Sequence, residues 1–287
     1  MGSIERVGVV GCGLMGSGIV EVCARAGLEV VIAEASEELL ASGLARIRTS
    51  LGRARASGKL APQAHDAALE RVHRTTALAD LGDCGLVIEA ISEQEEAKVE
   101  LFASLDRIAG PSAILASNTS SIPIARLGAA TSRPGSVVGL HFFNPVPVMP
   151  LVEVVASIRT DQATVEACEH FASSVLGKQT IRALDRAGFV VNSLLVPYLL
   201  AAVRMLEAGF ASAEAIDAGM ELGCAHPMGP LKLCDFIGVD TVKAIADSLY
   251  EELKDPSCAS PPLLLRMVDA GLLGRKNGRG FYEYSNR

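Results

Sequence analysis

His141 stands where a histidine could move a proton. It closes an apolar stretch at residues 136–141 that is typical of a strand, and Pro145 follows closely enough to stop a helix. A neutral imidazole has an unperturbed pKa of about 6.5, so it can accept a hydroxyl proton near neutral pH. A core or surface histidine with no chemical role is the alternative interpretation of this residue.

Glu153 is the one carboxylate in the apolar stretch at residues 151–155. Burying an ionised carboxylate without a partner is costly, so Glu153 is expected to contact a cation or a hydrogen-bond donor. The imidazole of His141 would be such a partner, and the carboxylate would fix its tautomer and raise its basicity. The alternative is that Glu153 faces solvent from an edge strand.

A glycine-rich turn near the amino terminus has the spacing of a dinucleotide site. It reads Gly11-Cys12-Gly13-Leu14-Met15-Gly16, between a predicted strand at 6–10 and a predicted helix at 14–26. The first glycine permits the tight turn, the second lets a pyrophosphate approach the backbone, and the third lets the helix pack on the strand. The helix start would then supply N–H groups for the phosphates.

Glu34 ends a second predicted strand at 30–33, about 20 residues after the glycine turn. A carboxylate at this offset accepts hydrogen bonds from ribose hydroxyls and repels a 2′-phosphate. The sequence therefore predicts NAD, and not NADP, as the cofactor. A plain turn followed by a solvated strand end is the alternative.

Two further polar segments could contact the cofactor or a substrate. Ser117-Asn118-Thr119-Ser120-Ser121 follows a predicted strand at 113–117, so it should reach the sheet edge at which His141 is expected. The same run could equally cap a helix before Pro123. Asn192 lies in apolar company, which predicts either an oriented hydrogen bond to a ligand or a polar contact between helices.

The elements that would position these residues alternate between strand and helix over the first two thirds of the chain. Further strands are predicted at 86–90, 136–141 and 151–155, and helices at 36–59, 62–72, 95–108 and 161–176. After residue 186 only helices are predicted, at 189–207, 212–222, 228–252 and 261–272. The pattern favours an α/β fold, a Rossmann-type doubly wound sheet with an inserted helical hairpin over residues 1–186, followed by an all-α domain over 187–287.

Composition limits the remaining classes. The 287 residues are 49% hydrophobic with a formal net charge of −7, and no run of Lys or Arg exceeds two, which argues against nucleic acid. The seven cysteines form no C-x-x-C pair, so neither a zinc site nor a redox motif is expected. Free cysteines of this kind predict a reduced, cytoplasmic chain. The first six residues and the apolar stretch 188–203 predict neither membrane targeting nor a membrane span.

The motifs together resemble one enzyme family. They are G-C-G-L-M-G-S-G-I, V-I-E-A-I-S-E, S-N-T-S-S, H-F-F-N-P-V-P-V-M, L-V-E-V, G-F-V-V-N-S-L-L-V-P-Y, G-P-L-K-L-C-D-F-I-G-V-D-T and G-R-K-N-G-R-G-F-Y. In this order they resemble the short-chain L-3-hydroxyacyl-CoA dehydrogenases of the bacterial 3-hydroxybutyryl-CoA dehydrogenase type. The resemblance spans nearly the whole chain and implies NAD-dependent, reversible oxidation of a short 3-hydroxyacyl thioester within fatty acid metabolism.

The resemblance also implies roles for individual residues. His141 would be the general acid/base and Glu153 would orient it, while Ser120, Asn144 and Asn192 would complete the active site. The cofactor set would be Gly11, Gly13, Leu14, Met15, Gly16, Glu34, Glu93, Lys98 and Asn118. A homodimer formed through the C-terminal domain is implied as well. No metal-binding residues are predicted.

Departures from the family pattern leave the acyl carrier open. Many members have Asp at the position of Glu34, another residue in place of Pro150, and a lysine near Ser57 that contacts the CoA nucleotide. Candidates to supply the missing contact are Ser50, Arg53, Arg55 and Lys59. The carrier could therefore be CoA or the phosphopantetheine arm of an acyl-carrier protein.

Two other functions remain alternatives. A β-hydroxyacid dehydrogenase acting on free acids would place a catalytic lysine early in the helical domain, but residues 179–231 contain none. A non-catalytic NAD-binding relative would be expected to have lost His141 or Glu153, and both are present.

Overall fold

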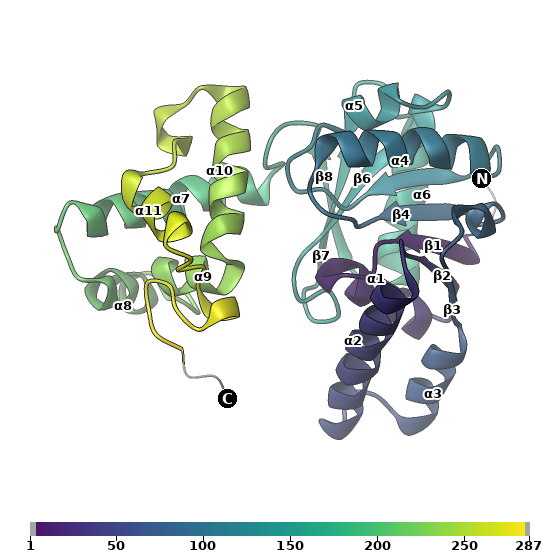
Figure 1. Cartoon of the computed structure of the whole chain (residues 1–287), viewed down its shortest axis with the longest axis horizontal. Coiled ribbons are helices and arrows are strands. Elements are labelled where there is room, and N and C mark those ends of the chain that lie inside the picture. Colours follow the sequence, from purple (N-terminus) through teal and green to yellow (C-terminus); the bar gives the residue numbers. More distant parts are fainter. Residues whose placement is uncertain (1–3, 285–287) are drawn as a thin grey trace. The chain divides into compact units, whose positions relative to one another are not determined.

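The computed structural model describes residues 4–284 and divides the chain into two compact units. Unit 1 comprises Met1–Asp185 and unit 2 comprises Arg186–Arg287 (Figure 1). The first three residues, part of the segment for which the sequence predicts no membrane targeting, lie outside the described residues.

Unit 1 is built on an eight-stranded sheet of order β3-β2-β1-β4-β5-β6-β7-β8. The strands are β1 (Arg6–Val10), β2 (Glu29–Ala33), β3 (Val72–Thr75), β4 (Leu86–Glu89), β5 (Ile114–Ser117), β6 (Val137–Phe142), β7 (Leu151–Ala156) and β8 (Gln179–Leu184). All neighbouring strands are parallel except β6 and β7, which are antiparallel. The strand order reverses between β1 and β4, where such sheets bind their ligands.

Helices cover both faces of this sheet. They are α1 (Leu14–Arg25), α2 (Glu37–Ala56), α3 (Pro62–Glu70), α4 (Glu95–Ile108), α5 (Ile124–Ala129) and α6 (Gln162–His170), which a π-turn at Phe171–Val175 extends. Residues of α1, α2, α3 and α6 share one core with alternate strand residues, and α4 and α5 pack together on the other face (Figure 1). The α2–α3 pair is the helical hairpin that the sequence predicts between strands.

Three details differ from the sequence-based expectation. The strands β3 and β8 were not predicted, because β3 carries the polar pair His73 and Arg74 and β8 is largely exposed. The short helix α5 was also missed. The turn from β6 to β7 spans only residues 143–150, too few for a parallel crossover, so β7 runs antiparallel to β6.

Unit 2 is helical and has its own core. Its helices are α7 (Val191–Glu207), α8 (Ala213–Gly223), α9 (Pro230–Ile237), α10 (Val239–Leu253) and α11 (Pro262–Asp269). The single helix predicted over 228–252 is wrong, because Gly238 adopts φ 106° and separates α9 from α10. No helix within residues 4–284 is both long enough and apolar enough to cross a membrane.

Candidate active site

The glycine turn between β1 and α1 uses each glycine differently. Gly11 adopts φ 91°, and a Cβ there would lie 2.7 Å from the carbonyl oxygen of Ala90. A Cβ on Gly16 would lie 1.9 Å from the carbonyl oxygen of Gly11, so only glycine lets α1 pack this closely. A Cβ on Gly13 would meet no described atom within 4 Å. The space above Gly13 is therefore the open one, as expected where a pyrophosphate must approach the backbone.

The start of α1 fits the phosphates of a dinucleotide. Gly13 is the N-cap, and no side chain of the described residues caps the helix there, so its first N–H groups can bind an anion. Leu14 is exposed and lies at the mouth of the turn, whereas Met15 packs against the core beneath it. The turn thus offers backbone donors outside and an apolar support inside.

Glu34 closes the far side of the turn. Its Oε1 accepts a hydrogen bond of 2.5 Å from the backbone N–H of Cys12, and its Oε2 accepts one from the N–H of Ala35. These contacts hold the carboxylate beside the glycine turn, where ribose hydroxyls could donate to its remaining lone pairs. Burial, with Glu34 nearby, raises the pKa of the Cys12 thiol to about 12, so Cys12 stays a protonated core side chain.

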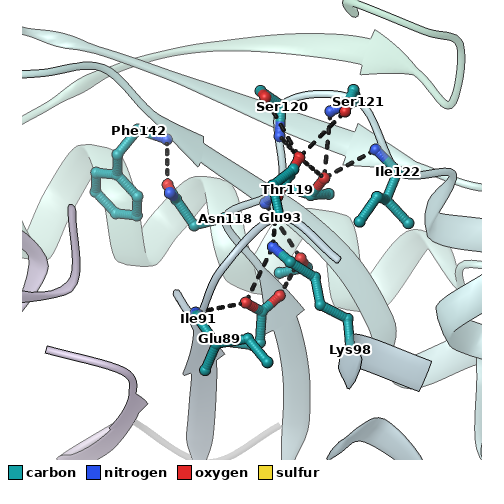
Figure 2. A network of polar contacts seen from close by, with 11 residues as sticks. Glu89, Ile91, Glu93, Lys98, Asn118, Thr119, Ser120, Ser121, Ile122 and Phe142 are labelled. Carbon is teal, nitrogen blue, oxygen red and sulfur yellow. Dashed lines mark hydrogen bonds and ion pairs between the residues drawn. The ribbon is translucent and has the colours of Figure 1, made fainter. Parts of the chain in front are cut away.

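A buried lysine lies between the end of β4 and the loop that follows it (Figure 2). Lys98, on α4, is 1% exposed and contacts Oε1 of Glu89 at 3.0 Å and Oε2 of Glu93 at 2.7 Å. Glu89, the last residue of β4, also accepts hydrogen bonds from the Ser117 hydroxyl and the Ile91 backbone N–H. The ammonium therefore neutralises two carboxylates that would otherwise repel each other.

The pKa values of Glu89 and Glu93 are shifted in opposite directions. Burial raises the pKa of Glu89, and the nearby Lys98 only partly opposes it. Burial alone would also raise the pKa of Glu93, but the charge of Lys98 and the hydrogen bonds to this carboxylate hold it below its ordinary value. Glu93 is thus the more firmly ionised of the pair.

Glu93 organises the polar run that follows β5. Its Oε1 accepts hydrogen bonds from the Thr119 hydroxyl at 2.5 Å and from the Ser120 N–H at 2.9 Å (Figure 2). The Ser120 hydroxyl donates to the same oxygen at 3.3 Å. Asn118 points the other way, and its Oδ1 accepts the backbone N–H of Phe142 at 2.9 Å, next to His141.

His141 and Glu153 lie opposite each other on β6 and β7. Their neighbours Leu140, Phe142 and Val152 belong to the core beneath α1 and α6, so the alternation of a strand turns His141 and Glu153 to the opposite face. Nδ1 of His141 lies 2.6 Å from Oε2 of Glu153, and both side chains are buried. An ionised carboxylate at this distance would accept a hydrogen bond from Nδ1 and so would select the tautomer in which Nδ1 carries the proton.

Asn144 lines a groove of about 440 Å³ in unit 1. The other walls of the groove come from α1 and α2, and they include Ser17, Ser50 and Arg53. Two of the residues predicted to contact the acyl carrier, Ser50 and Arg53, thus lie in one groove with Asn144. The exposed side chains of Arg55 and Lys59 are outside its lining.

Asn192 is a buried residue of unit 2, in the first turn of α7. Glu89 and Thr119 are members of the polar network that the sequence does not single out. Glu89 could have been found by the argument that identified Glu153, since it is a lone carboxylate at the end of the apolar strand Leu86–Glu89. Thr119 carried no distinguishing signal, because any hydroxyl of the Ser117–Ser121 run could have reached Glu93.

Comparison with known proteins defines the family. Residues 6–186 match the 3-hydroxyacyl-CoA dehydrogenase NAD binding domain, and residues 188–284 match the 3-hydroxyacyl-CoA dehydrogenase C-terminal domain. The chain is 58% identical to a 3-hydroxybutyryl-CoA dehydrogenase of Mycobacterium tuberculosis, over 98% of this chain and 99% of the relative. It is 44% identical to the mitochondrial hydroxyacyl-coenzyme A dehydrogenase of Sus scrofa, over 98% of this chain and 91% of the relative.

A solved structure agrees with these relatives. The crystal structure of (S)-3-hydroxybutyryl-CoA dehydrogenase PaaH1 from Ralstonia eutropha matches with a TM-score of 0.94 and 45% identity, covering 99% of this chain and all of that one. The chain belongs to the 3-hydroxyacyl-CoA dehydrogenase family. It is an NAD-dependent oxidoreductase with a Rossmann-type domain followed by a helical C-terminal domain.

Proposed function

We propose that this chain oxidises the 3-hydroxyl of a short 3-hydroxyacyl-CoA, of the 3-hydroxybutyryl-CoA type, and catalyses the reverse reduction. The observation that carries the proposal is the buried His141–Glu153 pair at the end of β6, next to Asn118 and to the sheet edge that bears the dinucleotide turn. The names of the relatives support the substrate class.

In this reaction Nε2 of His141 accepts the proton of the 3-hydroxyl group, while a hydride leaves the carbon that bears this hydroxyl. The glycine turn and Glu34 would hold NAD, which would supply the acceptor for the hydride. Glu153 keeps the proton on Nδ1 and stabilises the imidazolium that forms, so the lone pair of Nε2 stays directed at the substrate. In the reverse direction the imidazolium returns the proton to the oxygen that becomes the hydroxyl.

Ser120 and the amides act as orienting groups in the same proposal. Glu93 holds the Ser120 backbone through a hydrogen bond of 2.9 Å, which gives the hydroxyl a defined position from which to contact the 3-oxygen. Asn144, in the 143–150 turn of unit 1, would contact the substrate, and the family resemblance assigns a substrate contact to Asn192 as well. Glu93, Lys98 and Asn118 would support the nicotinamide half of the cofactor.

The groove beside Asn144 is the proposed site for the acyl carrier. Arg46 and Arg53 line it with positive charge against the one carboxylate of Glu21. Ser50 and Ser17 add hydroxyls that suit the amides and phosphates of a CoA arm. A carrier protein offers the same phosphopantetheine arm but no adenosine 3′-phosphate, so the rate on the two thioesters distinguishes them.

Assembly and location are part of the same proposal. Phe210 and Leu222 of unit 2 are 80% and 87% exposed, and such large apolar side chains suit a contact with a second copy, so we expect a homodimer. The seven cysteines are free thiols, so we expect the protein in the reducing cytoplasm. Sedimentation at micromolar concentration would show a dimer, whereas a monomer would contradict this part.

A substrate panel tests the proposal. We expect oxidation of 3-hydroxybutyryl-CoA with NAD, followed through NADH absorbance, to exceed oxidation of free 3-hydroxybutyrate by a large factor. The matched CoA thioesters with C4 to C10 acyl groups and a carrier-protein thioester define chain length and carrier. Faster turnover of the free acid would contradict the proposed substrate class, and a preference for the carrier-protein thioester would contradict the CoA assignment.

A further inference from the structure

The turn between β6 and β7, residues 143–150, forms one wall of the groove. Asn144, Pro145, Val146 and Pro147 all line it. The turn packs tightly on α1, because a Cβ on Gly18 would lie only 2.8 Å from Cβ of Val146. Val146 is 2% exposed, so the turn is anchored on this side by an apolar contact.

Lys178 makes a second, polar contact with the same turn. It lies just before β8, and its Nζ donates to the carbonyl oxygens of Val146 at 2.6 Å and Met149 at 2.7 Å. Its own backbone N–H donates to the carbonyl of Ala172, which fixes the base of the side chain. One ammonium thus bridges two carbonyls three residues apart in the turn.

Lys178 is partly buried near two charged residues of α1, Glu21 and Arg25. Burial lowers its pKa, Arg25 lowers it further, and Glu21 opposes both effects. Glu21 is 1% exposed on α1, where Arg25 contacts its Oε1 at 3.2 Å and its Oε2 has no hydrogen-bond partner within residues 4–284. Glu21 supplies negative charge that keeps a cation next to the turn favourable.

We propose that Lys178 is a positioning residue that holds the 143–150 turn, and with it Asn144, in the shape that binds the acyl thioester. Donors to two carbonyls restrict the turn, so the wall of the groove is set before the substrate arrives. Without them the turn would sample other conformations, and each binding event would have to order it.

The catalytic pair should be independent of this anchor. His141 and Glu153 are held by the strand register of β6 and β7, which runs over four residue pairs from Gly139↔Val155 to Phe142↔Val152. The glycine turn that binds NAD lies on β1 and α1, and Lys178 donates to neither. Loss of Lys178 should therefore raise the KM for the acyl thioester and leave kcat and the KM for NAD nearly unchanged.

The inference rests on the proposed acyl-CoA activity and is tested with the full chain. Lys178→Met is expected to raise the KM for 3-hydroxybutyryl-CoA about tenfold with kcat within about twofold of wild type. Lys178→Arg keeps donors at this place and should recover most of the loss. Lys254→Met, which removes a lysine exposed at the end of α10, is the matched control and should behave as wild type.

Gly18→Ala gives a second, independent test, because its Cβ would push Val146 and shift the turn while Lys178 stays intact. Gly18→Ala should also raise the KM for 3-hydroxybutyryl-CoA. If Lys178→Met does not fold, this variant tests the role of the turn on its own. An unchanged acyl KM in folded Lys178→Met, or in folded Gly18→Ala, would overturn the inference, as would an equal change in the KM for NAD. A wild-type protein that does not turn over the thioester would instead refute the proposed function.

Discussion

His141 and Glu153 are register partners in the one antiparallel strand pair that the sheet has within residues 4–284, and Nδ1 of His141 lies 2.6 Å from Oε2 of Glu153. The two residues are 12 positions apart in the chain, and a turn of eight residues brings them together. The ladder of β6 and β7 thus places an acid/base and its orienting carboxylate with no need for flexible loops. Preorganisation of this kind makes Glu153 the sharpest single target for mutation.

Glu153→Gln should leave the fold intact and lower kcat by between about 10² and 10⁴-fold, because the amide can stabilise the wrong tautomer and cannot neutralise the imidazolium. The KM for NAD should change little, since the cofactor turn lies on other strands. Steady-state kinetics with both substrates varied will measure this. Glu166→Gln, on the exposed face of α6, is the control, and a variant of Glu153 with wild-type kcat would exclude the orienting role.

The glycine turn allows a paired prediction. Gly13→Ala should cost about 1 kcal/mol or less in the free energy of unfolding, because its Cβ meets no described atom, but NAD affinity should fall about 10 to 100-fold as the backbone donors are shielded. Gly16→Ala should instead destabilise the protein by about 3 kcal/mol or more, because its Cβ would overlap the carbonyl of Gly11. Urea unfolding measures the loss of stability, and NADH titration measures the loss of affinity. Equal losses of stability in Gly13→Ala and Gly16→Ala would contradict the prediction.

Glu34 should set the choice between NAD and NADP. A carboxylate about 4 Å from a phosphate costs about 4 kcal/mol at an effective dielectric constant of 20, so kcat/KM with NAD should exceed that with NADP at least about 100-fold. Glu34→Gln keeps an acceptor for the Cys12 N–H but removes the charge, and the ratio should fall at least about tenfold. Glu37→Gln, exposed three residues later, should not change it. An unaltered ratio in Glu34→Gln would show that other groups discriminate.

Lys98→Met should destabilise unit 1 by about 3 to 5 kcal/mol, because Glu89 would be left buried without its cation. Burial already raises the pKa of Glu89, and removal of Lys98 would raise it further above the unfolded value of about 4.3. A carboxyl group with a raised folded pKa stabilises the fold below its unfolded pKa and loses this contribution as the pH rises through the folded value. The deficit should therefore be smaller at pH 5 than at pH 8.

The measurement is urea unfolding of Lys98→Met and wild type at both pH values. Lys243→Met, which removes a surface pair with Asp247, should cost less than about 1 kcal/mol at either pH. A deficit for Lys98→Met that is larger at pH 5 than at pH 8 would contradict the assignment of the buried charge to Glu89.

The apolar strands and the glycine turn could be predicted because their local pattern is strong. The stretches at β1, β2, β4 and β5 are apolar and bounded by turns, so their positions follow from periodicity alone. The edge strand β3 could not be recognised, since its two central side chains, His73 and Arg74, are polar and exposed. The break at Gly238 also depends on tertiary packing, because a lone glycine is often tolerated within a helix.

The site was predictable where a single residue breaks an apolar pattern. Glu153 requires a partner because it interrupts a buried strand, and in the structure His141 contacts it. The donors from Lys178 to the turn could not be foreseen, because they join segments about 30 positions apart that come together only when β8 adds to the sheet. The contacts of Lys98 with both Glu89 and Glu93 could not be foreseen either, because they depend on how α4 packs in the folded unit.

Proton transfer by His141 in an NAD-linked oxidation is the step on which the proposed function depends. The decisive measurement is turnover of 3-hydroxybutyryl-CoA by wild type and His141→Gln, with NADH affinity measured for both by fluorescence titration. We expect wild type to reduce NAD, and His141→Gln to lose activity by at least about 10²-fold while its NADH affinity stays within about twofold. Wild type that binds NADH without turning over the thioester, or a His141→Gln variant with wild-type activity, would contradict the central claim.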